Sequence, residues 1–215
     1  RNNSFQKWYE ALRLAGNRLD GARVKWVCRV GKNKDIIFCW ALHVNVYVAK
    51  EKRSKVNEVV ISRPDTAMIV MYRKDEIVED SDIVLIREFR SPVSNRSGFV
   101  WEVPGGSSFK PEQNALGVIV AECLEETGLK IGDPSRIRVH EARQLAATFS
   151  GHRAHLFSME INGQELEYMR SQKGVPHGNI GDSEMTYVEV VKLKDIFDSE
   201  DVDWSVLGMI LSVLK

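Results

Sequence analysis

The stretch WEVPGGSSFKPEQNALGVIVAECLEETGL, residues 101–129, decides the fold that the sequence predicts. Hydrophobic residues over 99–103 indicate a strand, and Pro-Gly-Gly at 104–106 indicates a turn directly after it. Beyond a loop, apolar residues at helical spacing predict a helix over 111–127, which Gly128 ends as a left-handed cap. The stretch therefore predicts a strand, a glycine turn and a helix in close succession.

The predicted helix has an apolar stripe and a separate acidic face. The stripe consists of Ala115, Leu116, Ile119, Val120, Cys123 and Leu124. Glu122, Glu125 and Glu126 stand at positions i, i+3 and i+4, so their carboxylates share another face. Because like charges on neighbouring turns repel, we expect a cation among these oxygens, and Mg²⁺ and Mn²⁺ are the hard ions that carboxylates prefer. The alternative is an acidic helix face in solvent.

The stretch resembles the Nudix box, whose pattern is G-x5-E-x7-R-E-U-x-E-E-x-G-U, with U an aliphatic residue. Gly106 leads to Glu112 at the spacing of the box, and ECLEETGL at 122–129 matches its second half. The lead-in EVPG at 102–105 is also similar. The sequence departs from the pattern twice, with a spacer of eight residues and with Ala121 in place of the box arginine. The resemblance extends over residues 24–197 and implies a Nudix fold.

The composition is that of a soluble globular chain. Its 215 residues include 30 Lys and Arg against 30 Asp and Glu, so net charge gives no argument for nucleic-acid binding. Three cysteines without metal-ligand spacing suit a reducing compartment and exclude a disulfide framework. The longest apolar run, 36–49, is too short for a bilayer. We expect an intracellular protein, cytoplasmic or mitochondrial, without a membrane segment.

The rest of the chain alternates between predicted strands and helices. We expect a helix over 4–19 with Ser4 as its N-cap, and a basic turn over 50–55. The strands are predicted over 24–30, 36–48, 59–62, 67–73, 83–89, 137–147, 154–161 and 185–191. A loop is expected over 172–182, and short helices over 193–197 and 204–214.

This order predicts an α/β (α+β) fold, an α/β/α sandwich with a small N-terminal β extension and an N-terminal helix. We expect residues 1–60 to form that helix and extension, as a dimer or partner element. Residues 61–215 are predicted to form the Nudix domain, with the box at 105–129.

The acidic face predicts a metal-dependent hydrolysis. A bound divalent ion neutralises a diphosphate and lowers the pKa of a coordinated water, and a carboxylate is then needed as general base. Glu122 and Glu126 are the best direct ligands, Glu125 is the next, and the carbonyl of Gly105 could complete the shell. By resemblance these positions match the metal ligands of the family.

A second source of carboxylates precedes the strand YVEV at 187–190. In the ADP-sugar and ADP-ribose pyrophosphatases, a branch that this region resembles, a glutamate in this place serves as metal ligand or base. Glu184 is therefore the predicted base, with Asp182 in reserve, and Glu125 is a further candidate catalytic carboxylate. A loop carboxylate that caps a turn is the alternative.

The run IREFRSP at 86–92 resembles V-x-Q-F-R-P-P of the same branch, so Arg87 or Arg90 is expected to contact a substrate phosphate. Trp26 and Trp40 resemble two tryptophans that sandwich an adenine in such enzymes, although a strand tryptophan is more often core. The N-terminal strands build a dimer in that branch, which implies a homodimer. Ala121 predicts a site about 10–100-fold weaker unless another residue, such as Arg87, Arg90 or Arg153, substitutes for the box arginine.

Three functions remain open at this point. The first is a Mg²⁺- or Mn²⁺-dependent Nudix hydrolase that cleaves the pyrophosphate of a nucleoside diphosphate linked to another moiety, as in ADP-ribose or an ADP-sugar. The second is an RNA 5′-end pyrophosphohydrolase in an RNA-processing complex, for example a mitochondrial one, where a protein partner supplies the affinity for RNA. The third is a catalytically degenerate Nudix scaffold or binding protein.

Overall fold

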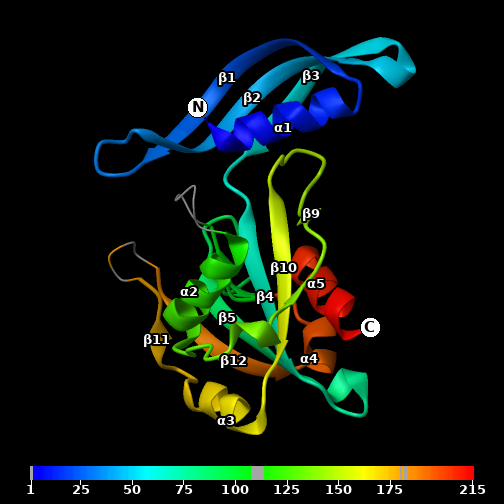
Figure 1. The fold of residues 1–215 in the computed structure, drawn as a ribbon. Coiled ribbons are helices and arrows are strands. Elements are labelled where there is room, and N and C mark those ends of the chain that lie inside the picture. The colour runs from blue at the N-terminus through cyan, green and yellow to red at the C-terminus, as the bar shows by residue number, and fades with distance from the viewer. Residues whose placement is uncertain (1, 108–113, 180, 182–183) are drawn as a thin grey trace. The chain divides into compact units, whose positions relative to one another are not determined.

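The computed structural model describes residues 2–107, 114–179, 181 and 184–215, and shows the mixed α/β fold that the sequence predicts (Figure 1). The chain divides into two compact units. Unit 1 consists of Arg1–Thr66, Ser107–Lys110 and Ala142–Ala154. Unit 2 consists of Ala67–Gly106, Pro111–Glu141 and His155–Lys215. The predicted domains 1–60 and 61–215 stay a prediction.

The elements of the described residues are as follows. The helices are α1 (Asn3–Leu14), α2 (Ala115–Thr127), α3 (Gly163–Ser171), α4 (Leu193–Phe197) and α5 (Trp204–Leu214). The strands are β1 (Arg18–Val30), β2 (Ile36–Val48), β3 (Arg53–Ser62), β4 (Thr66–Arg73), β5 (Asp82–Phe89), β6 (Phe99–Glu102), β7 (Gly105–Gly106), β8 (Arg138–Val139), β9 (Arg143–Gln144), β10 (Arg153–Glu160), β11 (Pro176–His177) and β12 (Thr186–Lys192).

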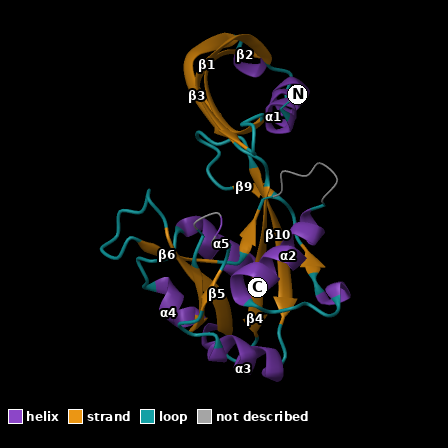
Figure 2. Cartoon of the chain, turned by 90° about the vertical axis from the view of Figure 1, so that its left-hand side faces the viewer, coloured by secondary structure: helices purple, strands orange, loops and turns teal. Residues whose placement is uncertain are grey.

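Unit 2 is an α/β/α sandwich around a mixed sheet, in which the strands follow the order β11-β12-β5-β4-β10-β8. Along each central strand, side chains pack alternately into one of two hydrophobic cores, because successive side chains point to opposite faces of the sheet. In β5, Val84 packs with α2 and α3, whereas Ile83 and Leu85 pack with α4 and α5. Both faces of the sheet are therefore covered by helices, as Figures 1 and 2 show.

Unit 1 is built on the antiparallel sheet β1-β2-β3, which is strongly curled with α1 on its inner side (Figure 2). The buried residues Trp40, Leu42, Val44 and Val46 alternate along β2 and form the core under α1. Phe5, Trp8 and Leu12 from α1 pack against them. The helix thus covers one face of the sheet, and the intervening residues of β2 point to the other.

The predicted N-terminal helix over 4–19 is too long. It ends at Leu14, because Gly16 has φ 78° and the chain then pairs with β2 from Arg18 onward. The N-cap is Asn2 instead of Ser4, and its side-chain oxygen accepts a hydrogen bond from the amide of Phe5 at 2.9 Å. The basic turn over 50–55 is also shorter than predicted, since β3 begins at Arg53.

The strand predicted over 137–147 is wrong, because only its two-residue segments β8 and β9 pair with β10. Helix α3 was not predicted, although Asn162 and Glu165 form a capping box that its sequence contains. The predicted loop over 172–182 includes the short strand β11. Helix α2 is described from Ala115 onward, and residues 111–113 of the prediction lie outside the described residues. Gly128 caps it with φ 71°, as predicted.

Candidate metal centre

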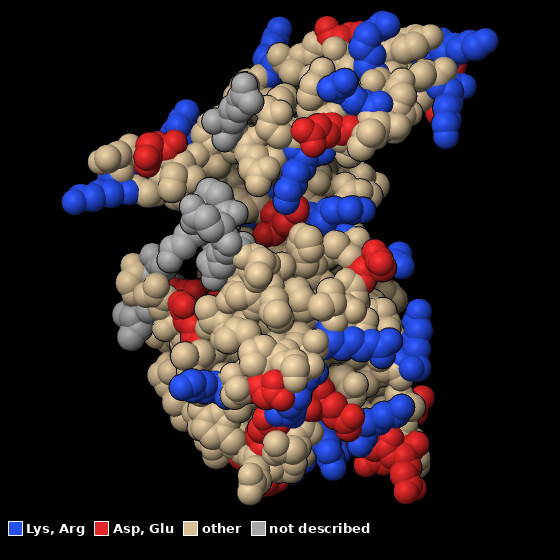
Figure 3. Space-filling model, in the orientation of Figure 1, with Lys and Arg blue, Asp and Glu red and all other residues tan. Residues whose placement is uncertain are grey.

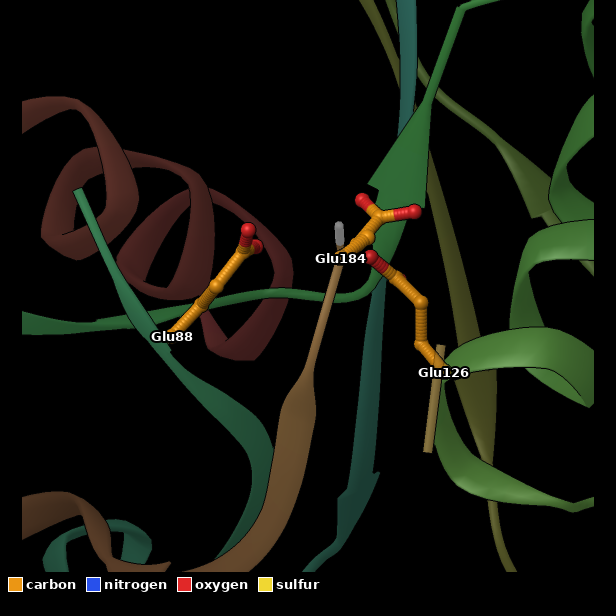
Figure 4. Close-up of side chains that lie close together, drawn as sticks. All are labelled: Glu88, Glu126 and Glu184. Carbon is orange, nitrogen blue, oxygen red and sulfur yellow. The ribbon is translucent and has the colours of Figure 1, made fainter. Parts of the chain in front are cut away.

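Three glutamates from distant parts of the chain meet in unit 2 (Figure 4). Glu88 lies near the end of β5, Glu126 in the last turn of α2, and Glu184 just before β12. One carboxylate oxygen from each lies within 4.8 Å of the other two. Glu88 and Glu126 are buried and Glu184 is half-buried. We call these three residues the carboxylate trio.

Glu126 is the most deeply buried member, with 1% of its surface exposed. Its Oε2 accepts a hydrogen bond from the amide of Gly105 at 2.8 Å. No described residue donates a hydrogen bond to its Oε1, which is also buried. A buried carboxylate oxygen without a hydrogen-bond donor raises the free energy of the folded protein. A positively charged ligand at this atom would remove that cost.

Burial is the main reason why the pKa of Glu126 is raised well above its ordinary value. The hydrogen bond from Gly105 lowers it, but repulsion from Glu122, Glu184 and Glu88 raises it further. The negative charge of this carboxylate is therefore destabilised where it stands. A cation between the carboxylates would remove both the repulsion and the missing contact.

The glycine pair of β7 lets the turn approach the acidic residues closely. Gly105 and Gly106 pair with Met68 and Ala67 of β4. A Cβ on Gly105 would collide with the carbonyl oxygen of Ala67, and one on Gly106 would collide with the carboxylate of Glu122. Gly105 thus depends on the absence of a side chain, whereas a side chain at residue 106 would displace the carboxylate of Glu122.

The three glutamates predicted on α2 have different surroundings. Glu126 belongs to the trio. Glu122 is half-buried, and burial, followed by repulsion from Glu125 and Glu184, raises its pKa from 4.5 to about 7. Glu125 is exposed. Helical spacing alone treats the three as equal, whereas the tertiary structure ranks them by burial. The ligand and catalytic roles predicted for them stay predictions, as does the carbonyl of Gly105.

Glu88 was not predicted as a site residue. It follows Val84 and Ile86 at two-residue spacing, so it points to the same side of β5 as these buried residues. Burial is the main reason that its pKa is raised to about 7, with Glu102 and Glu184 adding repulsion and Arg90 opposing it. A carboxylate at an inward position of a buried strand was the signal that could have identified it.

Arg90 is the arginine that lies beside the trio. Its Nη2 is 2.9 Å from Oε2 of Glu88 and 2.7 Å from Oε2 of Glu102, to which Nε also donates at 3.0 Å. Burial acts to lower the pKa of Arg90, but Glu102 and Glu88 outweigh it and the pKa is raised. Within the described residues, Arg90 forms no hydrogen bond with the buried Oε1 of Glu126, so it does not satisfy that atom.

Arg87, the other arginine predicted to contact substrate, points to the opposite face of β5. Its guanidinium lies 4.8 Å from the ring centroids of both Phe99 and Tyr187. Its Nε is 3.4 Å from Oε1 of Glu189. Since neighbouring strand residues face opposite ways, the structure brings Arg90 to the trio and does not bring Arg87.

The two tryptophans belong to unit 1, and only one is open to a ligand. Trp40 is 4% exposed, and its ring packs 5.9 Å from the rings of both Phe5 and Trp8. Its indole N–H is 2.8 Å from Oγ of Ser4. This burial agrees with the core alternative for Trp40, and its predicted substrate role stays a prediction. Trp26 is 54% exposed, and its predicted role stays a prediction.

Two further predicted carboxylates, Glu112 and Asp182, lie outside the described residues. Within the described residues, no helix is long and apolar enough to cross a bilayer. No protein-family model matches this chain, and no curated protein matches it. The resemblance to the Nudix family therefore stays a prediction from the residues of the box.

Proposed function

We propose that the protein is a Mg²⁺- or Mn²⁺-dependent hydrolase of the Nudix type, which cleaves the pyrophosphate bond of a nucleoside diphosphate linked to another moiety. The observation that carries this proposal is the buried Oε1 of Glu126, which accepts no hydrogen bond from the described residues, in a residue whose carboxylate clusters with those of Glu88 and Glu184. Buried oxygen ligands of this kind suit a hard divalent ion better than a lysine or a soft metal.

Glu126, Glu184 and Glu88 would hold the ion, with Glu122 beside them. When bound, it would neutralise the diphosphate and acidify a water molecule. Glu184 remains the proposed base, and Glu122 is a second candidate because a carboxylate with a pKa near 7 can take up a proton at neutral pH. The glycine turn over 105–106 would let the backbone approach the diphosphate.

Arg90 supports the proposal despite the missing box arginine. Ala121 is exposed on α2, so its small side chain leaves no gap in the core. Arg90 directly follows β5, and its ion pairs with Glu88 of that strand and Glu102 of β6 orient one member of the trio. We infer that Arg90 takes over the orienting role that the box arginine has in the family.

The test uses the purified chain with Mg²⁺ or Mn²⁺ on ADP-ribose, ADP-sugars, dinucleotide coenzymes and 5′-triphosphorylated RNA. Glu126→Gln keeps the shape of the side chain but removes its charge. We expect it to lower kcat/KM at least about 100-fold and to weaken Mn²⁺ binding in calorimetry. Glu76→Gln, at an exposed position of unit 2, is the matched control.

Two results would redirect the proposal. Turnover of RNA ends alone would favour the RNA pyrophosphohydrolase. Nucleotide binding without turnover of any substrate would favour the scaffold, for which Ala121 and the longer spacer already argue. Unchanged turnover in Glu126→Gln would remove the metal role of the trio altogether.

A further inference from the structure

The net charge of zero is the average of two oppositely charged units. Unit 1 contains 17 Lys and Arg against 6 Asp and Glu, which gives it a net charge of +11. Unit 2 contains 13 Lys and Arg against 24 Asp and Glu, which gives it −11. On the face drawn in Figure 3, lysine and arginine side chains cover more of unit 1 than acidic ones do. A strongly basic unit of this size points to a polyanionic partner.

Several of these cations form no ion pair with a described acidic residue. Ion pairs within the described part of unit 1 include Lys7–Asp65, Arg18–Asp20, Arg53–Glu51 and Lys55–Glu58. Five exposed cations on β1 and the turn after it form no ion pair with any described residue: Arg23, Lys25, Arg29, Lys32 and Lys34. At about 3.3 Å per residue, those on β1 alone extend over about 20 Å. They form a line of unbalanced positive charge along the edge strand of the sheet.

The register of the sheet places polar and aromatic groups on the face turned away from α1, which we call the outer face. Trp26 lies opposite Ala41, and Arg23 lies opposite His43. Since cross-strand partners point to the same side, and Ala41 and His43 are two residues apart, all four share this face. Lys25 is the extra residue at the bulge between Val24 and Trp26. The outer face therefore combines cations with an exposed indole ring.

The outer face also contains a surface pocket of about 330 Å³. Its lining residues are Gly21, Ala22, Arg23, Lys25, His43 and Asn45, none of which carries a carboxylate. The guanidinium, ammonium, imidazole and amide groups are all hydrogen-bond donors in one of their forms. A pocket with these donors suits a phosphate group, and its polar lining next to Trp26 suits a nucleotide.

From the charge, the pocket and the indole ring together, we propose that the outer face of unit 1 binds single-stranded RNA. Cations neutralise the phosphates, and Trp26 stacks on a base, as on other single-strand-binding surfaces. An anionic membrane would instead call for an apolar face that inserts among lipids, and polar His43 and Asn45 occupy this one. This function goes beyond the proposed hydrolase and does not depend on it.

The test measures the binding of a fluorescein-labelled 15-nucleotide oligouridylate to the full chain by anisotropy, in EDTA and at 50–200 mM KCl. EDTA removes divalent ions, so failure of the metal site cannot affect the result. Arg23→Glu combined with Lys25→Glu is expected to raise Kd at least 10-fold. It should also reduce the slope of log K against log[KCl] by about 1.4, since each lost phosphate contact contributes about 0.7.

The matched control is Lys130→Glu combined with Lys173→Glu, which changes the net charge equally at exposed positions of unit 2. Its Kd should stay within 2-fold of the unaltered chain. Equal weakening by both double variants would overturn the proposal, because overall charge and not the outer face would then decide binding. Circular dichroism checks that each variant is folded.

Trp26→Ala separates RNA from other polyanions. Loss of one stacked base should weaken oligouridylate at least 5-fold and leave binding of inorganic polyphosphate within 2-fold. Equal effects on both ligands would overturn the assignment to RNA. So would binding of phosphatidylserine vesicles, or salt-sensitive self-association in sedimentation, by a chain that does not bind oligouridylate at 50 mM KCl.

Discussion

The two units handle charge in opposite ways. Unit 1 keeps its excess cations on exposed strands, where water and salt screen them and their mutual repulsion costs little. Unit 2 brings carboxylates together at half-buried and buried positions, where Glu88 and Glu122 have pKa values of about 7. Exposed charges without counter-charges indicate an extended, oppositely charged partner, whereas buried charges without counter-charges indicate a small counter-ion. Net charge over the whole chain conceals both.

The largest expected effect contrasts a buried and an exposed tryptophan of unit 1. Trp40→Ala empties the core under α1 and should lower the free energy of unfolding by about 3–5 kcal/mol. Trp26→Ala, on the outer face of the same sheet, should change it by less than about 1 kcal/mol. Urea unfolding followed by circular dichroism measures both. Similar losses would mean that the outer face is also part of a core.

Gly106→Ala tests the crowding of the acidic site in unit 2. Because its Cβ would collide with the carboxylate of Glu122, that carboxylate must move away from the turn, which a flexible side chain can do at a small cost in stability. We also expect Mn²⁺ affinity to fall at least about 10-fold in calorimetry. Gly163→Ala, whose Cβ would meet no atom within 4 Å, should leave both quantities nearly unchanged. If Gly106→Ala bound Mn²⁺ as tightly as the unaltered chain, Glu122 would not take part in metal binding.

Stability of the metal-free protein should fall with rising pH. Folding raises the pKa of Glu88 and of Glu122 from 4.5 to about 7, so the folded state binds more protons than the unfolded state between these values. The stability that these two raised pKa values contribute is fully present below pH 4.5 and is lost as pH rises through 7. We expect the free energy of unfolding to fall by at least about 1 kcal/mol between pH 5 and pH 8, which corresponds to a fall of about 2–4 °C in Tm.

Two comparisons sharpen that pH dependence. Saturating Mn²⁺ should restore Tm at pH 8, because a bound cation favours the charged carboxylates. Glu88→Gln should flatten the pH dependence in EDTA. A Tm that does not change between pH 5 and pH 8 in the unaltered chain would show that burial and repulsion do not raise the pKa values of these carboxylates.

The smallest effect concerns the exposed charges of unit 1. Arg18 and Asp20 form an ion pair with 69% and 33% of their side chains exposed. Replacing both by alanine should leave the free energy of unfolding nearly unchanged, because solvent screens such pairs. Arg90→Ala in unit 2 should cost several times more, since it leaves Glu88 buried without its cation. Equal costs in urea unfolding would remove the contrast between the units.

Local patterns predicted some elements closely and others poorly. The strand over 36–48 and the helix over 204–214 have the bounds that the structure shows, because each has an uninterrupted apolar pattern of sufficient length. The predicted strand over 137–147 has fewer apolar residues and three charged ones. Its pairing depends on where β10 lies, and only its segments β8 and β9 pair with β10. Strand pairing is nonlocal, so composition cannot define it.

The candidate site divides in the same way. The sequence predicted Glu126 and Glu184, because a helix end and a strand start with family-like neighbours are local features. Glu88 was missed, because the run at 86–92 was interpreted only through its arginines, as contacts for a substrate phosphate. Only the pleat of β5 shows that Glu88 and Arg87 face opposite sides of the sheet.

The sequence by itself determined the glycine turn, the helix with three glutamates on one face, the apolar patterns and the total of each charge. These follow from chain spacing and composition, which need no tertiary contact. Only the tertiary structure decided which carboxylates are buried together, and that the basic residues gather in one unit, to which residues 142–154 also belong. The physical reason is that burial and repulsion depend on distances through space, and residues far apart in the chain set those distances when the strands pair.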